Sequence, residues 1–122
     1  MARRIGPFTP KVSQGGAAAD GALNARATAI VAHNDLLAIG VVQRLTQRSV
    51  RVPEDVSVVG FDDVPQAEFY WPALTTVAQD FSELGRRALS VALAAVRGDD
   101  GTTVDLIEPH LLIRSSTAPP GG

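Results

Sequence analysis

The feature that most constrains the fold is an alternation of short β-branched runs with longer segments of helical periodicity. An apolar run over residues 28–32 precedes a helical pattern over 36–47, and runs over 56–61 and 74–77 precede a helical pattern over 82–97. Strands that alternate with helices of this length are typical of parallel sheets. Because the run over 28–32 is continuously apolar, we expect it to be buried on both faces. The sequence therefore predicts an α/β fold on a parallel sheet.

Capping residues mark the ends of the predicted helices. Ser13 precedes a segment with alanines at helical spacing, Asp35 precedes the second helix, and Gly98 follows the last one. Serine and aspartate side chains accept hydrogen bonds from free amides at helix starts, and glycine tolerates the left-handed residue that often ends a helix. We expect Ser13 and Asp35 to be N-caps. Three weaker strands are expected, over residues 4–8, 103–107 and 111–114.

Charge and composition exclude several classes of function. The 11 basic and 13 acidic residues give a net charge of -2, so no basic surplus is available for a DNA backbone. Without cysteine there is no disulfide and no thiolate metal site. We find no apolar secretory core after the N-terminal arginines and no apolar run long enough for a membrane span. We expect a cytoplasmic protein with no membrane contact and no cofactor.

Polar side chains follow each of the three main strands. In open parallel sheets, ligands bind beyond the carboxyl ends of the strands. Carboxylates accept hydrogen bonds, amides donate and accept them, and a polyol ligand needs several such partners. The residues selected in this way are His33, Asn34, Asp35, Asp62, Asp63, Gln79 and Asp80. From position alone, capping is the favoured role for Asp35, Asp63 and Asp80.

Catalytic motifs are weak in this sequence. The adjacent pair Asp62 and Asp63 gives no spaced acid and base, because neighbouring side chains point in different directions. The sequence contains no nucleophile elbow, Walker loop or zinc-protease motif. Gly15 and Gly16 do not match a dinucleotide-binding loop and are interpreted as a helix start. We predict no catalytic residue, no metal ligand and no enzyme activity.

An aromatic segment, Phe69, Tyr70 and Trp71, is closed by Pro72. Proline cannot continue a helix, so an extended loop is expected here. Clustered aromatic residues are typical of protein interfaces, but they equally fit a small satellite core beneath the loop. Both interpretations stay open at this point.

Five segments along the chain form one ordered set. They are TAIVAHNDLLAIG (28–40), VPEDVSVVGFDD (52–63), LTTV (74–77), LGRRA (84–88) and LLIRSST (111–117). With these segments in this order, the chain resembles the LacI/GalR family of bacterial transcription regulators from about residue 5 to the C-terminal end. The segment over 52–63 is highly specific.

This resemblance implies a type I periplasmic-binding-protein-like fold of two α/β lobes, with an effector in the cleft between them. We expect residues 1–122 to be a partial effector-binding and dimerisation domain that lacks the DNA-binding helix-turn-helix. Residues 5–77 would form part of the C-terminal lobe, residues 78–110 the hinge and the return to the other lobe, and residues 111–122 the final strand and tail. The last helix and strand would belong to the other lobe.

The resemblance also assigns roles to particular residues. Asn34 and Asp62 match positions that hydrogen-bond effector hydroxyls, and Gln79 and Phe81 match positions that line the pocket. The segment of Phe69, Tyr70 and Trp71 matches a homodimer interface. Ser49 stands where the family commonly has glycine, so a left-handed turn there would cost about 1 kcal/mol.

The implied function is the sensing of a small-molecule effector, a sugar, in a regulator that reaches DNA only through its missing head. One alternative is a transport-type sugar-binding protein of the same fold. Another is a small α/β enzyme that uses Asp62 or His33. Because the lobe surfaces would be uncovered, we also expect the chain to self-associate.

Overall fold

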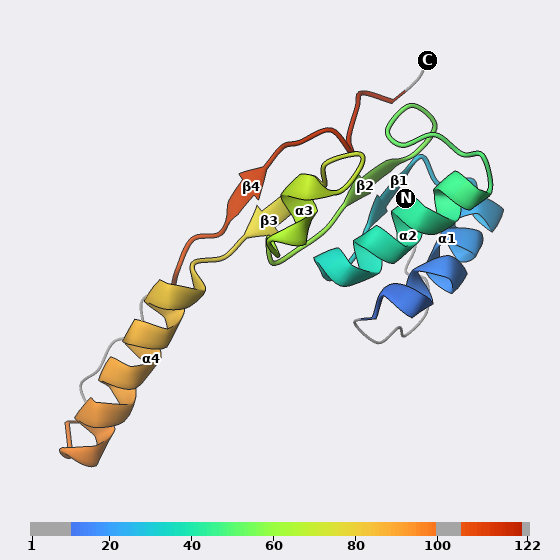
Figure 1. The fold of residues 1–122 in the computed structure, drawn as a ribbon. Coiled ribbons are helices and arrows are strands. Elements are labelled where there is room, and N and C mark those ends of the chain that lie inside the picture. The colour runs from blue at the N-terminus through green and yellow to red at the C-terminus, as the bar shows by residue number, and fades with distance from the viewer. Residues whose placement is uncertain (1–10, 100–105, 121–122) are drawn as a thin grey trace.

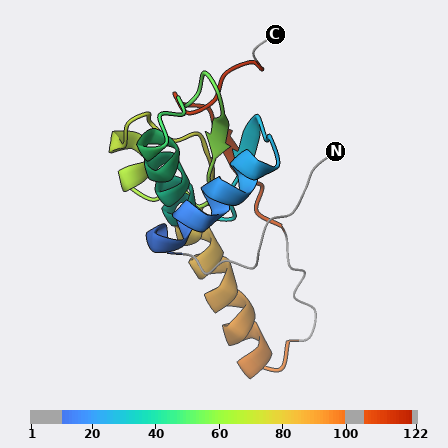
Figure 2. The same cartoon turned by 90° about the vertical axis from the view of Figure 1, so that its right-hand side faces the viewer.

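A computed structural model describes residues 11–99 and 106–120. The strand expected over residues 4–8 and the start of the one expected over 103–107 lie outside these ranges. The described chain forms an α/β body from which one long helix extends, as Figures 1 and 2 show from two directions.

The sheet confirms the predicted parallel α/β class. The strands of the described residues are β1 (Ala29–Val31), β2 (Ser57–Val59), β3 (Thr76–Ala78) and β4 (His110–Leu112). β1 pairs with β2 in parallel, and parallel bridges from Val59 to Thr75 and from Asp62 to Ala78 place β3 on the other side of β2. β4 then pairs with β3 antiparallel. The spatial order is therefore β1, β2, β3 and β4, with the first three parallel.

The helices agree with the predicted pattern. They are the 3-10 turn η1 (Val12–Gln14) and the α-helices α1 (Gly15–Asn24), α2 (Asp35–Gln47), α3 (Gln66–Phe69) and α4 (Phe81–Val96). The predicted apolar stripe of α2, which includes Leu37, Val41 and Leu45, is buried against β2 and α1. Gly98 follows α4 with a φ of 77°, the left-handed conformation that ends many helices.

Three local predictions were wrong. Ser13 lies inside η1, and the residue before α1, Gln14, makes no side-chain capping bond. The N-cap of α2 is Asn34 rather than Asp35. In β1, Val31 is 78% exposed, so this strand is covered on one face only. Continuous apolar character predicted burial from sequence, but burial also depends on what else packs on the sheet.

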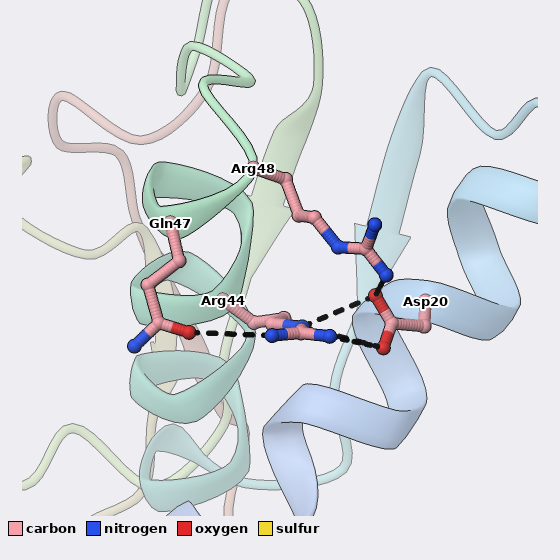
Figure 3. Close-up of polar contacts among 4 residues, drawn as sticks. All are labelled: Asp20, Arg44, Gln47 and Arg48. Carbon is pink, nitrogen blue, oxygen red and sulfur yellow. Dashed lines mark hydrogen bonds and ion pairs between the residues drawn. The ribbon is translucent and has the colours of Figure 1, made fainter.

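An ion cluster joins α1 to α2 at the surface (Figure 3). The Asp20 carboxylate accepts hydrogen bonds from Arg44 Nη2 at 2.8 Å and from Arg48 Nη2 at 3.0 Å, and Arg44 Nη1 donates to Gln47 Oε1 at 3.5 Å. The hydrogen bonds from Arg44 hold the pKa of Asp20 below its usual range. Because Arg44 and Asp20 are each about one-third exposed, this surface ion pair is expected to add little to the stability of the fold.

The turn after α2 is left-handed. Ser49, which is not glycine, has a φ of 58° there. A side chain in this region costs about 1 kcal/mol relative to glycine. The chain therefore accepts a small strain at the end of α2.

Helix α4 extends away from the body and has no buried residue. Its apolar side, which includes Leu84 and Val91, lines a groove of about 570 Å³ together with Leu106, Ile107 and Pro109. In Figure 1, α4 begins shortly after β3, and β4 lies beside β3. Within the described residues, no helix has the length and apolar character needed to cross a bilayer.

Candidate functional site

Three of the predicted site residues come together beyond the carboxyl ends of the parallel strands. Gln79, just after β3, donates from Nε2 to Asp62 Oδ1 at 3.0 Å. Asp62 lies in the loop after β2, and its amide donates to the Val77 carbonyl at 2.9 Å. Asn34 adjoins this loop, because the amide of the next residue, Asp35, donates to the Phe61 carbonyl at 2.9 Å.

The fourth predicted pocket residue, Phe81, is the first residue of α4. Its amide donates to the Gln79 carbonyl at 3.1 Å, and its ring is exposed. Asp80 accepts from the Glu83 amide at 2.8 Å and caps α4, as predicted. Phe81 is therefore held next to Gln79, at the point where the chain leaves the body.

Asn34 has a structural task in addition to its predicted ligand contact. Its Oδ1 accepts a hydrogen bond from the Leu37 amide at 2.9 Å and caps α2. An amide side chain also carries two N–H donors on its nitrogen. With the oxygen committed to the helix, Asn34 can offer these donors to a hydroxyl oxygen.

Asp35 is the buried centre beneath this site rather than a cap. Its side chain is fully buried and accepts hydrogen bonds from Thr76 Oγ1 at 2.5 Å and from the Val64 amide at 2.8 Å. These two bonds join the start of α2 to β3 and to the loop after β2. The carboxylate also lies in the first turn of α2, where the helix dipole favours negative charge.

Gly60 makes room for this carboxylate. A methyl group at Gly60 would lie 2.1 Å from Asp35 Oδ1 and 2.9 Å from Leu74 Cδ2. No side chain fits at such distances. Gly60 is therefore a position of close approach, where the carboxylate of Asp35 leaves no room for a side chain.

The loop that carries Asp62 has an unusual backbone. Asp62 has a φ of 106° and Asp63 a φ of 54°, a region that residues other than glycine seldom adopt. Such conformations persist only where the surroundings enforce them, and they gather at ligand-binding sites. The strain therefore supports a functional role for this loop independently of its sequence.

Asp63 is ion-paired rather than a cap. Its Oδ1 accepts from Arg114 Nη2 at 2.8 Å, and both side chains are largely covered, at 18% exposed for Arg114 and 29% for Asp63. Sequence reasoning assigned no role to Arg114. The available signal was one charged residue directly after the apolar run of the last strand, but its partner is distant in sequence.

Ser116 was also missed. Its hydroxyl is buried between β2 and β3, where it donates to the Val58 carbonyl at 2.6 Å and accepts from the Thr75 amide at 2.8 Å. The Val58 amide donates in turn to the Ser116 carbonyl at 2.8 Å. The C-terminal segment thus joins the two strands, β2 and β3, that precede Asp62 and Gln79.

The resulting site offers one carboxylate and two amide side chains around an open edge of the sheet. Within the described ranges, no group of three or more histidine or acidic side chains is arranged to hold a metal ion. Donors and acceptors in this arrangement can hydrogen-bond a ligand that carries several hydroxyl groups.

Comparison with known proteins decides the family. The periplasmic binding protein-like domain family matches residues 3–117. The chain belongs to this family. Within it, the chain is 40% identical over 94 residues to the HTH-type transcriptional repressor PurR of Haemophilus influenzae, covering 73% of this chain and 28% of PurR. It is 37% identical over 91 residues to the repressor CytR of Escherichia coli, covering 74% of this chain and 27% of CytR.

Solved structures of LacI-type regulators match the fold of this chain. The lac repressor dimer bound to operator and the anti-inducer ONPF matches with a TM-score of 0.82 and 32% identity, over 89% of this chain and 39% of that one. A LacI family regulator of Enterococcus faecium with bound ribose matches with a TM-score of 0.82 and 29% identity, over 94% and 43%. The chain therefore spans less than half of the regulators it resembles, and the predicted resemblance is confirmed.

The predicted interface segment lies at the end of α3. Phe69 and Trp71 are 84% and 88% exposed, whereas Tyr70 packs against the core. The expected extended loop is partly wrong, since Phe69 still belongs to α3. Tyr70 fits the core interpretation, and the two exposed rings are free to meet a partner.

Proposed function

We propose that this chain is the effector-sensing and dimerisation part of a LacI-type transcription regulator of the cytoplasm. Its effector would be a sugar, held by Asn34, Asp62, Gln79 and Phe81. Residues 5–77 would belong to the C-terminal lobe, residues 78–110 to the hinge and the other lobe, and residues 111–122 to the final strand and tail.

The observation that carries this proposal is the hydrogen bond between Gln79 and Asp62 in a strained loop. Asp62 Oδ1 accepts from Gln79, and its second carboxylate oxygen provides further acceptor sites for hydroxyls. Asn34 supplies donors beside it. The ribose-bound relative has the same fold and supports a sugar as the ligand class.

The proposed mechanism follows from the position of α4, which begins at Phe81 and extends away from the body. An effector that contacts Asp62 on the body and Phe81 at the start of α4 would bind most tightly at one relative position of the two parts. A ligand shifts such an equilibrium only by its difference in affinity for the two states. In a complete regulator, this shift would alter the spacing of the DNA-binding heads.

Asp62→Ala is expected to weaken effector binding at least tenfold, because a charged hydrogen-bond acceptor contributes about 1.5–3 kcal/mol. The measurement is a thermal-shift titration with ribose first and then a panel of pentoses, hexoses and nucleobases, since bound ligand raises the melting temperature. Glu54→Ala, an exposed acidic residue in the turn before β2, is the control. Equal affinity of wild type and Asp62→Ala would contradict the assignment.

We also propose that Phe69 and Trp71 form the homodimer contact. Exposed aromatic side chains of this size are typical of interface centres. The double variant Phe69→Ser with Trp71→Ser is expected to shift the chain from dimer to monomer in sedimentation experiments. The control is Leu89→Gln with Leu93→Gln on exposed positions of α4. If only the α4 variant dissociated the chain, self-association would come from α4.

A further inference from the structure

The left-handed turn at Asp62 and Asp63 needs an explanation in its surroundings. Neither residue is glycine, yet both have positive φ angles, of 106° and 54°. A flexible loop would relax from such angles, so contacts made by the neighbouring side chains must hold them. Hydrogen bonds from Gln79 to Asp62 and from the Val64 amide to Asp35 fix the two sides of the turn.

A further contact to the turn comes from the distant residue Arg114. Its Nη2 donates to Asp63 Oδ1 at 2.8 Å, and its Nη1 donates to the Leu74 carbonyl at 3.0 Å. The Arg114 amide donates to Thr75 Oγ1 at 3.0 Å. The planar guanidinium is therefore held at both terminal nitrogens, and the Arg114 backbone is held through its amide. The side chain presents a fixed charge to Asp63.

Arg114 follows β4, which pairs with β3 shortly before the start of α4. We propose that Arg114 is a positioning residue for Asp62: its ion pair with Asp63 holds the left-handed turn that aims the Asp62 carboxylate toward the effector. This inference rests on the proposed function, because it assumes that Asp62 binds the effector. The clamp, which is the ion pair of Arg114 with Asp63, can be tested without a ligand.

The position of the ion pair between Arg114 and Asp63 supports a positioning role over a general contribution to the stability of the fold. Asp63 is the next residue after Asp62, so rotation of the Asp63 backbone would redirect the preceding carboxylate. Among the described residues, Arg114 forms an ion pair with Asp63 and with no other acidic side chain. Removal of its charge therefore acts on this turn first.

The test is amide hydrogen exchange by NMR on the whole chain. Arg114→Gln is expected to speed exchange of the Asp62 and Val64 amides about tenfold, while the Ala32 amide, bonded to the Val59 carbonyl, keeps its rate. The side-chain amide signal of Gln79 should also move, because its bond to Asp62 is disturbed. General destabilisation would speed all three amides equally.

Two further variants sharpen the result. Asp63→Asn removes the charge from the other end and should give the same local effect, with no added effect in the double variant with Arg114→Gln. Arg51→Gln breaks a more exposed ion pair with Asp55 elsewhere on the body and should leave Asp62 unchanged. Uniform acceleration, or unchanged exchange at Asp62, would overturn the proposal. Because no ligand is present, failure would count against the clamp and not against effector binding.

Discussion

Asp35→Ala is expected to lower the free energy of unfolding by about 4 kcal/mol, because the buried Thr76 hydroxyl and the half-buried Val64 amide both lose their hydrogen-bond acceptor. Asp35 is fully buried and accepts a hydrogen bond from each of these two groups. A buried donor without a partner costs roughly 1–3 kcal/mol, and a cavity adds to that loss. Urea unfolding followed by circular dichroism measures the change.

A graded series separates this cause from a general sensitivity of the helix start. Thr76→Val removes one of the two hydrogen bonds and should cost about 1 kcal/mol. Asn34→Ala, at the neighbouring position, removes only the capping bond to the Leu37 amide and should also cost about 1 kcal/mol. If Asp35→Ala cost no more than Asn34→Ala, Asp35 would not be the buried centre described above.

Gly60→Ala is expected to lower the free energy of unfolding by about 3 kcal/mol, because overpacking at a rigid site forces the surroundings apart. The added methyl would meet Asp35 Oδ1 at 2.1 Å and Leu74 Cδ2 at 2.9 Å. The carboxylate cannot withdraw without loss of its bonds to Thr76 and Val64. Chemical denaturation of the purified variant gives the number.

The matched control is Gly16→Ala in α1. A methyl group there would meet only the Arg44 side chain, at 4.0 Å. In a helix, alanine instead of glycine stabilises by about 0.5–1 kcal/mol. The two substitutions should therefore change stability in opposite directions. Equal effects would show that the close approach at Gly60 can relax without cost.

Strand and helix positions followed well from sequence. Apolar periodicity placed α2 and α4 within one residue of their observed starts, because it depends on local spacing alone. The rule for parallel sheets led to Asn34, Asp62 and Gln79; the structure brings Gln79 and Asp62 into contact, and their binding of a ligand stays a prediction. The capping of α2 failed because Asn34 and Asp35 are adjacent and chemically similar. Local sequence cannot say which one turns inward.

By itself, the sequence determined the α/β class, the family resemblance, and the strand ends for which ligand binding is proposed. Only the tertiary structure decided that Asp35 is buried, that Gly60 must lack a side chain, and that Arg114 holds Asp63. Each of these contacts joins residues that are 25 or more positions apart or lie on different elements. Periodicity carries no information on which distant side chains meet, because that depends on how the elements pack.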